Sequence, residues 1–323
     1  MKVQYKSFDA KRRFGVELEV SNNVDSNQIK SAILKATRRE VVVSGGWTQT
    51  TGNDFWHIKK DSTCGPLSHL QKDYSWEIAS FVASGHKDIK EICNVSKQMV
   101  EAGVVTNQNC GFHIHAEVKD CNALDVAVLL AYWIKIEPMI CFLVSSKRLN
   151  NKHCKLWSKV KKINKKFKYQ PNDFWDLIKP TDFSPHENIQ RKVSLNLINL
   201  ASAINHETNF GEDTYNRKTL ELRLPDGTLD GDEIQNWIRL FLMFIDSNKN
   251  RTMPDDLCPI YDINLFLEIV GLSHHEEFYL LSKSLTKTKL WILSKIMNSE
   301  HARNTRKGES VRAKVERKYM SII

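Results

Sequence analysis

The chain of 323 residues lacks the marks of several protein classes. No run of about 18 uncharged apolar residues is present, so we expect no membrane-spanning helix. The first residues, Met1 to Lys6, hold no apolar signal core, so we do not expect secretion. The seven cysteines form no Cys-x-x-Cys pair. This usage argues against a zinc ribbon or a disulfide scaffold and predicts reduced thiols in a cytoplasm.

Acidic residues are also missing from one segment of a chain whose net charge is +9. Between Lys147 and Lys168 there are ten Lys or Arg residues and no Asp or Glu. Between Lys283 and Lys318 there are eleven basic and three acidic residues. Two interpretations stay open for these basic segments: solvated helical faces, or a docking surface for nucleic acid or an acidic protein.

The expected elements show no internal repeat and no regular alternation of strand and helix. The residue patterns predict strands at 14–20, 40–44, 55–60, 75–80, 112–118, 192–200 and 219–224. They predict helices at 25–37, 86–102, 123–144, 233–246, 261–270, 276–285 and 289–297, with a charged helix or tail at 300–320. Asp25 or Ser26 is expected to cap the first helix, Gly103 to end the second and Pro138 to kink the third. This mixture predicts an α+β fold with a largely antiparallel sheet.

Two carboxylates alternate with apolar residues in the first expected strand. Because residues i and i+2 of a strand face the same way, Glu17 and Glu19 project together, opposite Val16, Leu18 and Val20. Adjacent like charges are unfavourable unless a cation lies between them, and magnesium prefers oxygen ligands. The pattern therefore indicates a metal site or a solvent-facing sheet edge.

Two histidines share one face of the strand expected at 112–118. His113 and His115 alternate with Phe112 and Ile114, which would pack into the core. An imidazole ligates a metal or donates to a phosphate oxygen. The other interpretation is a pair of ordinary hydrogen-bonded polar residues.

Glu221 and Arg223 alternate with leucines in the last expected strand. The guanidinium group offers a fork of donors that fits phosphate oxygens. A same-face ion pair is the plainer interpretation. Asp61 and Glu77 lie between the first two motifs as weaker candidates. Acids, histidines and an arginine on one side of a sheet would make a metal–nucleotide site, in which cations neutralise the phosphates of the nucleotide.

In their order along the chain these residues resemble the amidoligase family, which is related to glutamine synthetase and glutamate–cysteine ligase. The resemblance runs from Phe14 to about Leu240. It rests on Phe14–Glu19, Asp61–Ser62, Glu77–Ser80, Cys110–His115, Thr219–Arg223 and Asp226–Asp230.

The resemblance implies a curved, mostly antiparallel sheet flanked by helices, whose concave face holds ATP and roughly two or three divalent cations, Mg²⁺ or Mn²⁺. The implied metal ligands are Glu17, Glu19, Glu77, His113 and Glu221. The implied phosphate contacts are His115 and Arg223. Asp61 is implied to ligate metal or to orient an amine, and substrate or phosphate contacts are implied for Arg148, Arg191 and Asn196.

The implied reaction joins a carboxylate to an amine at the expense of ATP. The carboxylate attacks the γ-phosphate, and the amine then displaces phosphate from the acyl phosphate. We therefore expect a catalytic domain at 1–250, with a basic insertion at about 147–170, and a helical basic extension at 251–323. Phe81 stands where the family pattern leads us to expect proline, and the basic segment after Lys147 also departs from that pattern.

Three other functions fit part of the sequence. A cupin-type metalloenzyme would use His113 and His115, but it needs a third histidine on a later strand, and it leaves Glu221 and Arg223 without a purpose. A nucleic-acid-binding protein with a degenerate ligase site would use the basic segments, with aromatic residues for stacking. A guanidino phosphotransferase would use the same ATP site and form no amide.

Overall fold

A computed structural model describes residues 11–21, 24–44, 54–65, 75–160, 192–197, 200, 218–272 and 283–319. The chain divides into two compact units, each built from two stretches of sequence. The first comprises residues 1–116 and 225–239, and the second comprises 117–224 and 240–323. The predicted division into a catalytic domain at 1–250 and an extension at 251–323 is a functional one, and it stays a prediction.

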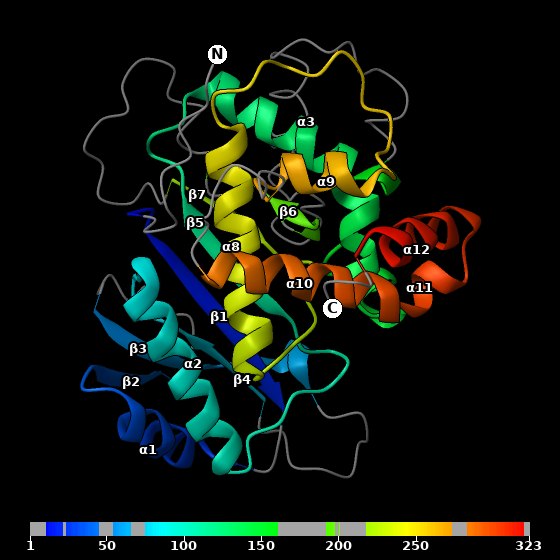
Figure 1. Cartoon of the computed structure of the whole chain (residues 1–323). Coiled ribbons are helices and arrows are strands. Elements are labelled where there is room, and N and C mark those ends of the chain that lie inside the picture. The colour runs from blue at the N-terminus through cyan, green and yellow to red at the C-terminus, as the bar shows by residue number, and fades with distance from the viewer. Residues whose placement is uncertain are drawn as a thin grey trace. The chain divides into compact units, whose positions relative to one another are not determined.

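The first unit is built on strands in the order β2-β3-β4-β1-β5 (Figure 1). Their bounds are β1 Phe14–Ser21, β2 Glu40–Ser44, β3 Phe55–Lys60, β4 Ser75–Ala79 and β5 Phe112–Glu117. β1 pairs antiparallel with both β4 and β5, and β3 pairs antiparallel with β4, whereas β2 and β3 run parallel. The predicted α+β class and the mostly antiparallel pairing are confirmed, as are these five predicted strands.

Two helices supply apolar side chains to the core of the first unit. α1 (Ser26–Ala36) begins at the predicted cap, Asp25, whose carboxylate accepts from the backbone N–H groups of Asn27 and Gln28. α2 (Gly85–Glu101) packs on α1 and lies across the strands in Figure 1. It ends before Gly103, which has a φ of 84° and so acts as the predicted stop. The buried residues of the helices include Ile29, Ile33, Ile89, Ile92 and Met99, and those of the strands include Val16, Leu18, Ile58, Ile78 and Ile114.

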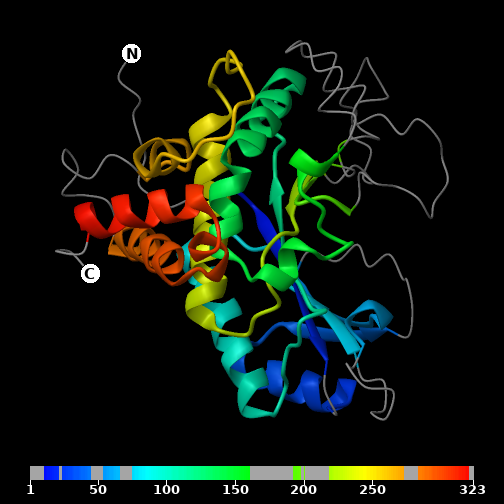
Figure 2. The ribbon, with the colours of Figure 1, turned by 90° about the vertical axis from the view of Figure 1, so that its right-hand side faces the viewer.

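The second unit is mainly helical and is seen from the side in Figure 2. Its helices are α3 Ala123–Ile140, α4 Ser146–Leu149, the second half of α8 (Gly231–Asn248), α9 Ile263–Ile269, α10 Lys283–Asn298, α11 Glu300–Arg303 and α12 Arg306–Tyr319. Short 3-10 turns are η2 (Cys141–Leu143) and η3 (Trp157–Lys159), and a two-strand pair is formed by β6 (Leu195–Asn196) and β7 (Thr219–Leu222). Within the predicted basic extension, residues 251–262 are not helical, and most of the described residues from Ile263 onward are.

α3 forms the centre of the second unit. The window Leu124–Leu143 is long and apolar enough to cross a membrane, with a mean hydropathy of 1.8, but 83% of it is buried inside the protein. The Trp133 ring meets the Phe244 ring of α8 edge-on at 5.5 Å. Such burial is typical of the core helix of a globular unit.

Several elements of the second unit are shorter than predicted. β6 covers two residues of the strand predicted at 192–200, of which 198 and 199 lie outside the described residues. β7 ends at Leu222 rather than at 224, and Pro225 has no N–H with which to continue a ladder. α3 ends at Ile140, two residues after Pro138, and gives way to η2. Residues 276–282 of a predicted helix also lie outside the described residues.

Candidate functional site

The strands of the first unit bring most of the predicted ligands onto one face. Directly paired residues of antiparallel strands project from the same face. Glu17 is paired with His113 on β5, and Glu19 is paired with Glu77 on β4. His115 follows His113 at the next position on that face. The alternation that predicted a shared face within each strand therefore extends across three strands.

Glu17 lies between the two histidines. Its two carboxylate oxygens are 3.1 Å from Nδ1 of His113 and 3.2 Å from Nε2 of His115. Burial acts to raise the pKa of Glu17, but the charges and hydrogen bonds of His115 and His113 hold it well below its usual range. Glu17 is therefore an anion that is half-buried and held by imidazole groups.

Glu19 is more deeply buried, with 7% of its surface exposed. Its Oε2 accepts a 2.5 Å hydrogen bond from the backbone N–H of Gly111. Its Oε1 lies 3.5 Å from Nε2 of His113. Each of the two ring nitrogens of His113 thus faces a different carboxylate.

Glu77 lies between Glu19 on the neighbouring strand β1 and Lys59 on the neighbouring strand β3. The Lys59 ammonium lies 2.5 Å from Oε1 of Glu77, and the two residues are paired across β3 and β4. Burial and the Glu17 charge raise the pKa of Glu77 to about 8, although Lys59 opposes the rise. Burial acts to lower the pKa of Lys59, but the charges of Glu77 and Glu17 leave it raised overall.

Asp61 stands at the start of a 3-10 turn close to Glu19. Its Oδ1 accepts from the backbone N–H of Thr63 at 2.7 Å and from the Thr63 hydroxyl at 2.8 Å. The turn, η1 (Ser62–Cys64), directs Cys64 back toward the same place. Ligand atoms of Glu19, Asp61 and Cys64 lie within 4.8 Å of one another, close enough to hold one ion.

A tight backbone contact fixes the start of β5 beside Glu19. The N–H of Gly227 donates to the carbonyl of Cys110 at 3.0 Å, and the N–H of Phe112 donates to the carbonyl of Pro225 at 3.3 Å. A Cβ at Gly227 would lie 2.5 Å from that of Cys110, so only glycine fits there. The contact holds Gly111, whose N–H binds Glu19, in place.

Phe81 has a packing role that accounts for its departure from the expected proline. It is 1% exposed, and its ring meets Trp56 edge-on at 5.8 Å. The Arg39 guanidinium lies 3.6 Å from the ring centroid. The preceding Ser80 hydroxyl accepts from the N–H of Val16 at 2.9 Å, which ties β1 to the end of β4.

The second unit contains the remaining described candidates. Glu221 is buried and forms an ion pair with Arg223. Nδ2 of Asn196, on the neighbouring strand β6, donates to Oε2 of Glu221 at 2.6 Å. Nε of Arg223 donates to the carbonyl of His153 at 3.3 Å. The prediction that Glu221 and Arg223 project together is confirmed by this contact.

Arg148 contacts the backbone around Arg223. Its Nη2 donates to the carbonyl of Arg223 at 2.6 Å, and its Nε donates to that of Leu224 at 3.3 Å. With 2% of its surface exposed, Arg148 positions this end of β7. Its predicted contact with substrate stays a prediction. Arg191 lies outside the described residues.

Three polar residues of the first unit's face were missed in the sequence. His57 and Lys59 alternate with Trp56 and Ile58 on β3, and Cys64 follows Asp61 by one turn. For His57 and Lys59, the signal was the same period-two pattern that pointed to Glu17 and Glu19; Cys64 lies on the turn η1 and shows no such pattern. His57 is a third histidine on this face, and its Nε2 lies 2.7 Å from the hydroxyl of Ser44.

The first unit is therefore an α+β scaffold that presents buried and half-buried carboxylates and imidazoles on one sheet face. A family model described as "Putative amidoligase enzyme" matches residues 10–245. The chain belongs to this amidoligase family, a family of amide-bond-forming ligases. No curated protein matches the chain.

Proposed function

We propose that this protein is an ATP-dependent carboxylate–amine ligase that requires Mg²⁺ and works through an acyl phosphate. The observation that carries the proposal is the contact of Glu17 and Glu19 with both nitrogens of His113. Family membership favours this chemistry over a cupin-type metalloenzyme. We also propose that its partners are a carboxylate substrate and an amine substrate, and that the protein is located in the cytoplasm.

The residues present fit a divalent cation. A neutral imidazole has one N–H and one lone pair. His113 faces a carboxylate at each nitrogen, so one of its two contacts is repulsive unless the ring gains a proton or a cation lies beside it. Glu19 and Glu77 are also paired directly across two strands, so ionisation of both would place like charges side by side. Carboxylate oxygens and imidazole nitrogens are together suitable ligands for Mg²⁺ or Mn²⁺.

The proposed cation ligands in the first unit are Glu17, Glu19, Glu77 and His113, with Asp61 as a further oxygen ligand. His115 is proposed to donate to a phosphate oxygen. A bound cation supplies positive charge that neutralises the phosphates of ATP. The buried position of Glu19 supports this role, because a carboxylate with little access to water gains most from a cation.

The proposed phosphate contact in the second unit is Arg223. Its ion pair with Glu221 holds the guanidinium in one orientation, and the Asn196 amide holds the other oxygen of Glu221. A guanidinium that is already oriented stabilises a developing phosphoryl charge with little reorganisation. Glu221 is also proposed as a metal ligand, and Arg148 as the residue that positions the backbone at Arg223.

The reaction needs positioning more than acid–base chemistry. A carboxylate oxygen of the first substrate attacks the γ-phosphorus, and ADP leaves. The amine nitrogen then attacks the acyl carbon, phosphate leaves, and the nitrogen loses a proton. Asp61 is proposed to orient the amine or to accept that proton. Holding the two substrates together accounts for much of the rate gain.

Binding of Mg-ATP tests the proposal. We expect isothermal titration to give a dissociation constant on the order of micromolar for the parent, with no binding in EDTA. The Glu19→Gln and Glu221→Gln variants are each expected to bind at least roughly tenfold more weakly. Glu101→Gln, which changes an exposed carboxylate on α2, is the matched control. Equal binding by the parent and both site variants would contradict the assignment.

Trapping of the intermediate tests the chemistry. With hydroxylamine as the amine, a panel of carboxylates is expected to contain at least one that yields a hydroxamate together with ADP. The Glu19→Gln variant should lose both products. Formation of AMP and pyrophosphate instead would indicate an acyl adenylate and would refute the acyl phosphate.

A further inference from the structure

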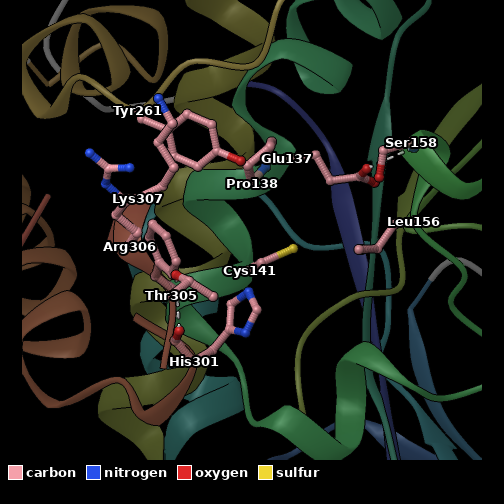
Figure 3. A pocket seen from close by; sticks show the side chains of 11 residues that line it. Glu137, Pro138, Cys141, Leu156, Ser158, Tyr261, His301, Thr305, Arg306 and Lys307 are labelled. Carbon is pink, nitrogen blue, oxygen red and sulfur yellow. Dashed lines mark hydrogen bonds between the residues drawn. The ribbon is translucent and has the colours of Figure 1, made fainter. Parts of the chain in front are cut away.

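A pocket of about 320 Å³ lies within the second unit and is separate from the residues discussed above. It is lined by parts of α3, η2 and η3 and by residues of the C-terminal segment around Tyr261 and the turn between α11 and α12 (Figure 3). The family match ends at residue 245. The C-terminal segment therefore builds one wall of a cavity whose other wall belongs to the family region. Its volume is in the range of sites for small molecules.

The inner surface of the pocket is apolar and aromatic. Pro138, Cys141, Phe142 and Leu156 contribute the apolar part. The rings of Phe142 and His301 have centroids 5.6 Å apart. Burial and the charge of Lys159 lower the pKa of His301, which favours a neutral imidazole. Rings on the wall of a cavity favour a flat apolar group in it.

The single acidic residue among the lining side chains is turned away from the cavity. Glu137 points toward Ser158 in Figure 3. Its Oε1 accepts from the N–H of Trp157 at 2.9 Å and from the Ser194 hydroxyl, and its Oε2 accepts from the N–H of Ser158 at 3.2 Å. Both oxygens are thus occupied inside the protein.

The edge of the pocket is cationic. Arg306 and Lys307, the first residues of α12, both line it and are both exposed. Lys307 lies 5.6 Å from the centre of the Tyr261 ring. Neither cation forms a salt bridge with a carboxylate in the part of the chain that the structure describes. An anion at this edge would therefore meet two positive charges without displacing an acidic residue.

We propose that this pocket binds a small organic anion that carries an aromatic ring, such as an aryl phosphate or an aryl carboxylate. The ring would lie among Phe142, Tyr261 and His301. The anionic group would lie beside Arg306 and Lys307, which form charge-assisted hydrogen bonds with it. The site is independent of the proposed ligase chemistry, because none of its residues belongs to the metal or phosphate ligands.

The experiment uses phenyl phosphate, titrated calorimetrically into the full-length protein with and without Mg-ATP. We expect binding in both conditions, and at least roughly tenfold weaker binding of inorganic phosphate or phenol. The Arg306→Ala/Lys307→Ala variant should bind phenyl phosphate at least roughly tenfold more weakly than the parent. The Arg317→Ala/Lys318→Ala variant is the control, because it removes two exposed charges from the same helix and leaves the ion pair of Lys314 with Asp262, beside Tyr261, in place.

A third variant separates the ring from the charge. Tyr261→Leu should weaken binding of phenyl phosphate and leave binding of inorganic phosphate unchanged. The proposal is overturned if phenyl phosphate does not bind the parent, or if both double variants lose the same affinity. It is also overturned if inorganic phosphate binds as tightly as phenyl phosphate. Loss of binding in the presence of Mg-ATP would place the probe at the nucleotide site and would overturn it too.

Discussion

If Glu77 binds a cation as proposed, its carboxyl group is expected to couple proton release to cation binding. Its pKa is raised to about 8 by burial and by the neighbouring Glu17 charge. At pH 7 a group with this pKa is about 90% protonated. A cation that binds the Glu77 carboxylate must displace that proton, so we expect the release of about 0.9 proton from Glu77 at pH 7 and about 0.1 at pH 9.

Calorimetry of Mg²⁺ binding in two buffers measures this number. Protons released by the protein are taken up by the buffer, so at one pH the observed enthalpy falls as the ionisation enthalpy of the buffer rises, and the magnitude of this negative slope counts the protons released. Glu77→Gln removes the titrating group, so we expect the magnitude of the slope at pH 7 to be smaller by about 0.9 proton per cation. Glu101→Gln should leave the slope unchanged, because that carboxylate is exposed on α2.

An equal slope for the parent and Glu77→Gln would refute the role of Glu77, and no binding of Mg²⁺ by the parent would refute the cation site as a whole.

The pH dependence of stability, measured without a cation, gives a second check of the raised pKa of Glu77. Because the folded state holds the Glu77 proton more tightly than the unfolded state, the free energy of unfolding falls as pH rises from the usual pKa of 4.5 to about 8. Glu77→Gln should lack this contribution, as urea denaturation across that pH range would show.

Three further predictions concern stability and are measured by urea denaturation. Asp25→Ala should destabilise the protein by about 1 kcal/mol through loss of the α1 cap, whereas Asp25→Asn should cost less, and equal losses would contradict the capping role. Gly103→Ala should cost about 1 kcal/mol, because a Cβ there meets no atom within 4 Å and the positive φ alone opposes it. Glu137→Ala should cost about 2 to 4 kcal/mol, because the buried N–H of Trp157 and the Ser158 N–H lose their acceptor. A loss below about 0.5 kcal/mol would contradict this last account.

The elements that could be predicted from the sequence depend on local interactions. The cap at Asp25 and the stop at Gly103 involve residues a few positions apart. The strands around Glu17 and His113 were visible because alternation is itself a local pattern. These features do not depend on which strand lies beside which.

The pairing of the strands could not be read in the same way. Glu17 and His113 are 96 residues apart, and several registers place a carboxylate beside an imidazole. The register brings Lys59 beside Glu77, and this contact could not be predicted because the period-two pattern assigns Lys59 to a face of its strand but does not name its partner. The environment that raises the pKa of Glu77 arises from residues of three strands, so it exists only in the folded unit.

The first unit is discontinuous in sequence. The chain leaves this unit after residue 116 and returns to it at residue 225. On its return, the carbonyls of Leu229 and Gly231 accept from Ser96 and Cys93 of α2. During synthesis, this unit therefore stays incomplete until residue 239 has left the ribosome. A chain shortened to end at residue 116 would retain the residues that bind one another around Glu17 but would leave α2 and the backbone of Cys110 without their partners. Isolation of the first unit as a folded fragment thus requires a circularly permuted or fused chain rather than a simple truncation.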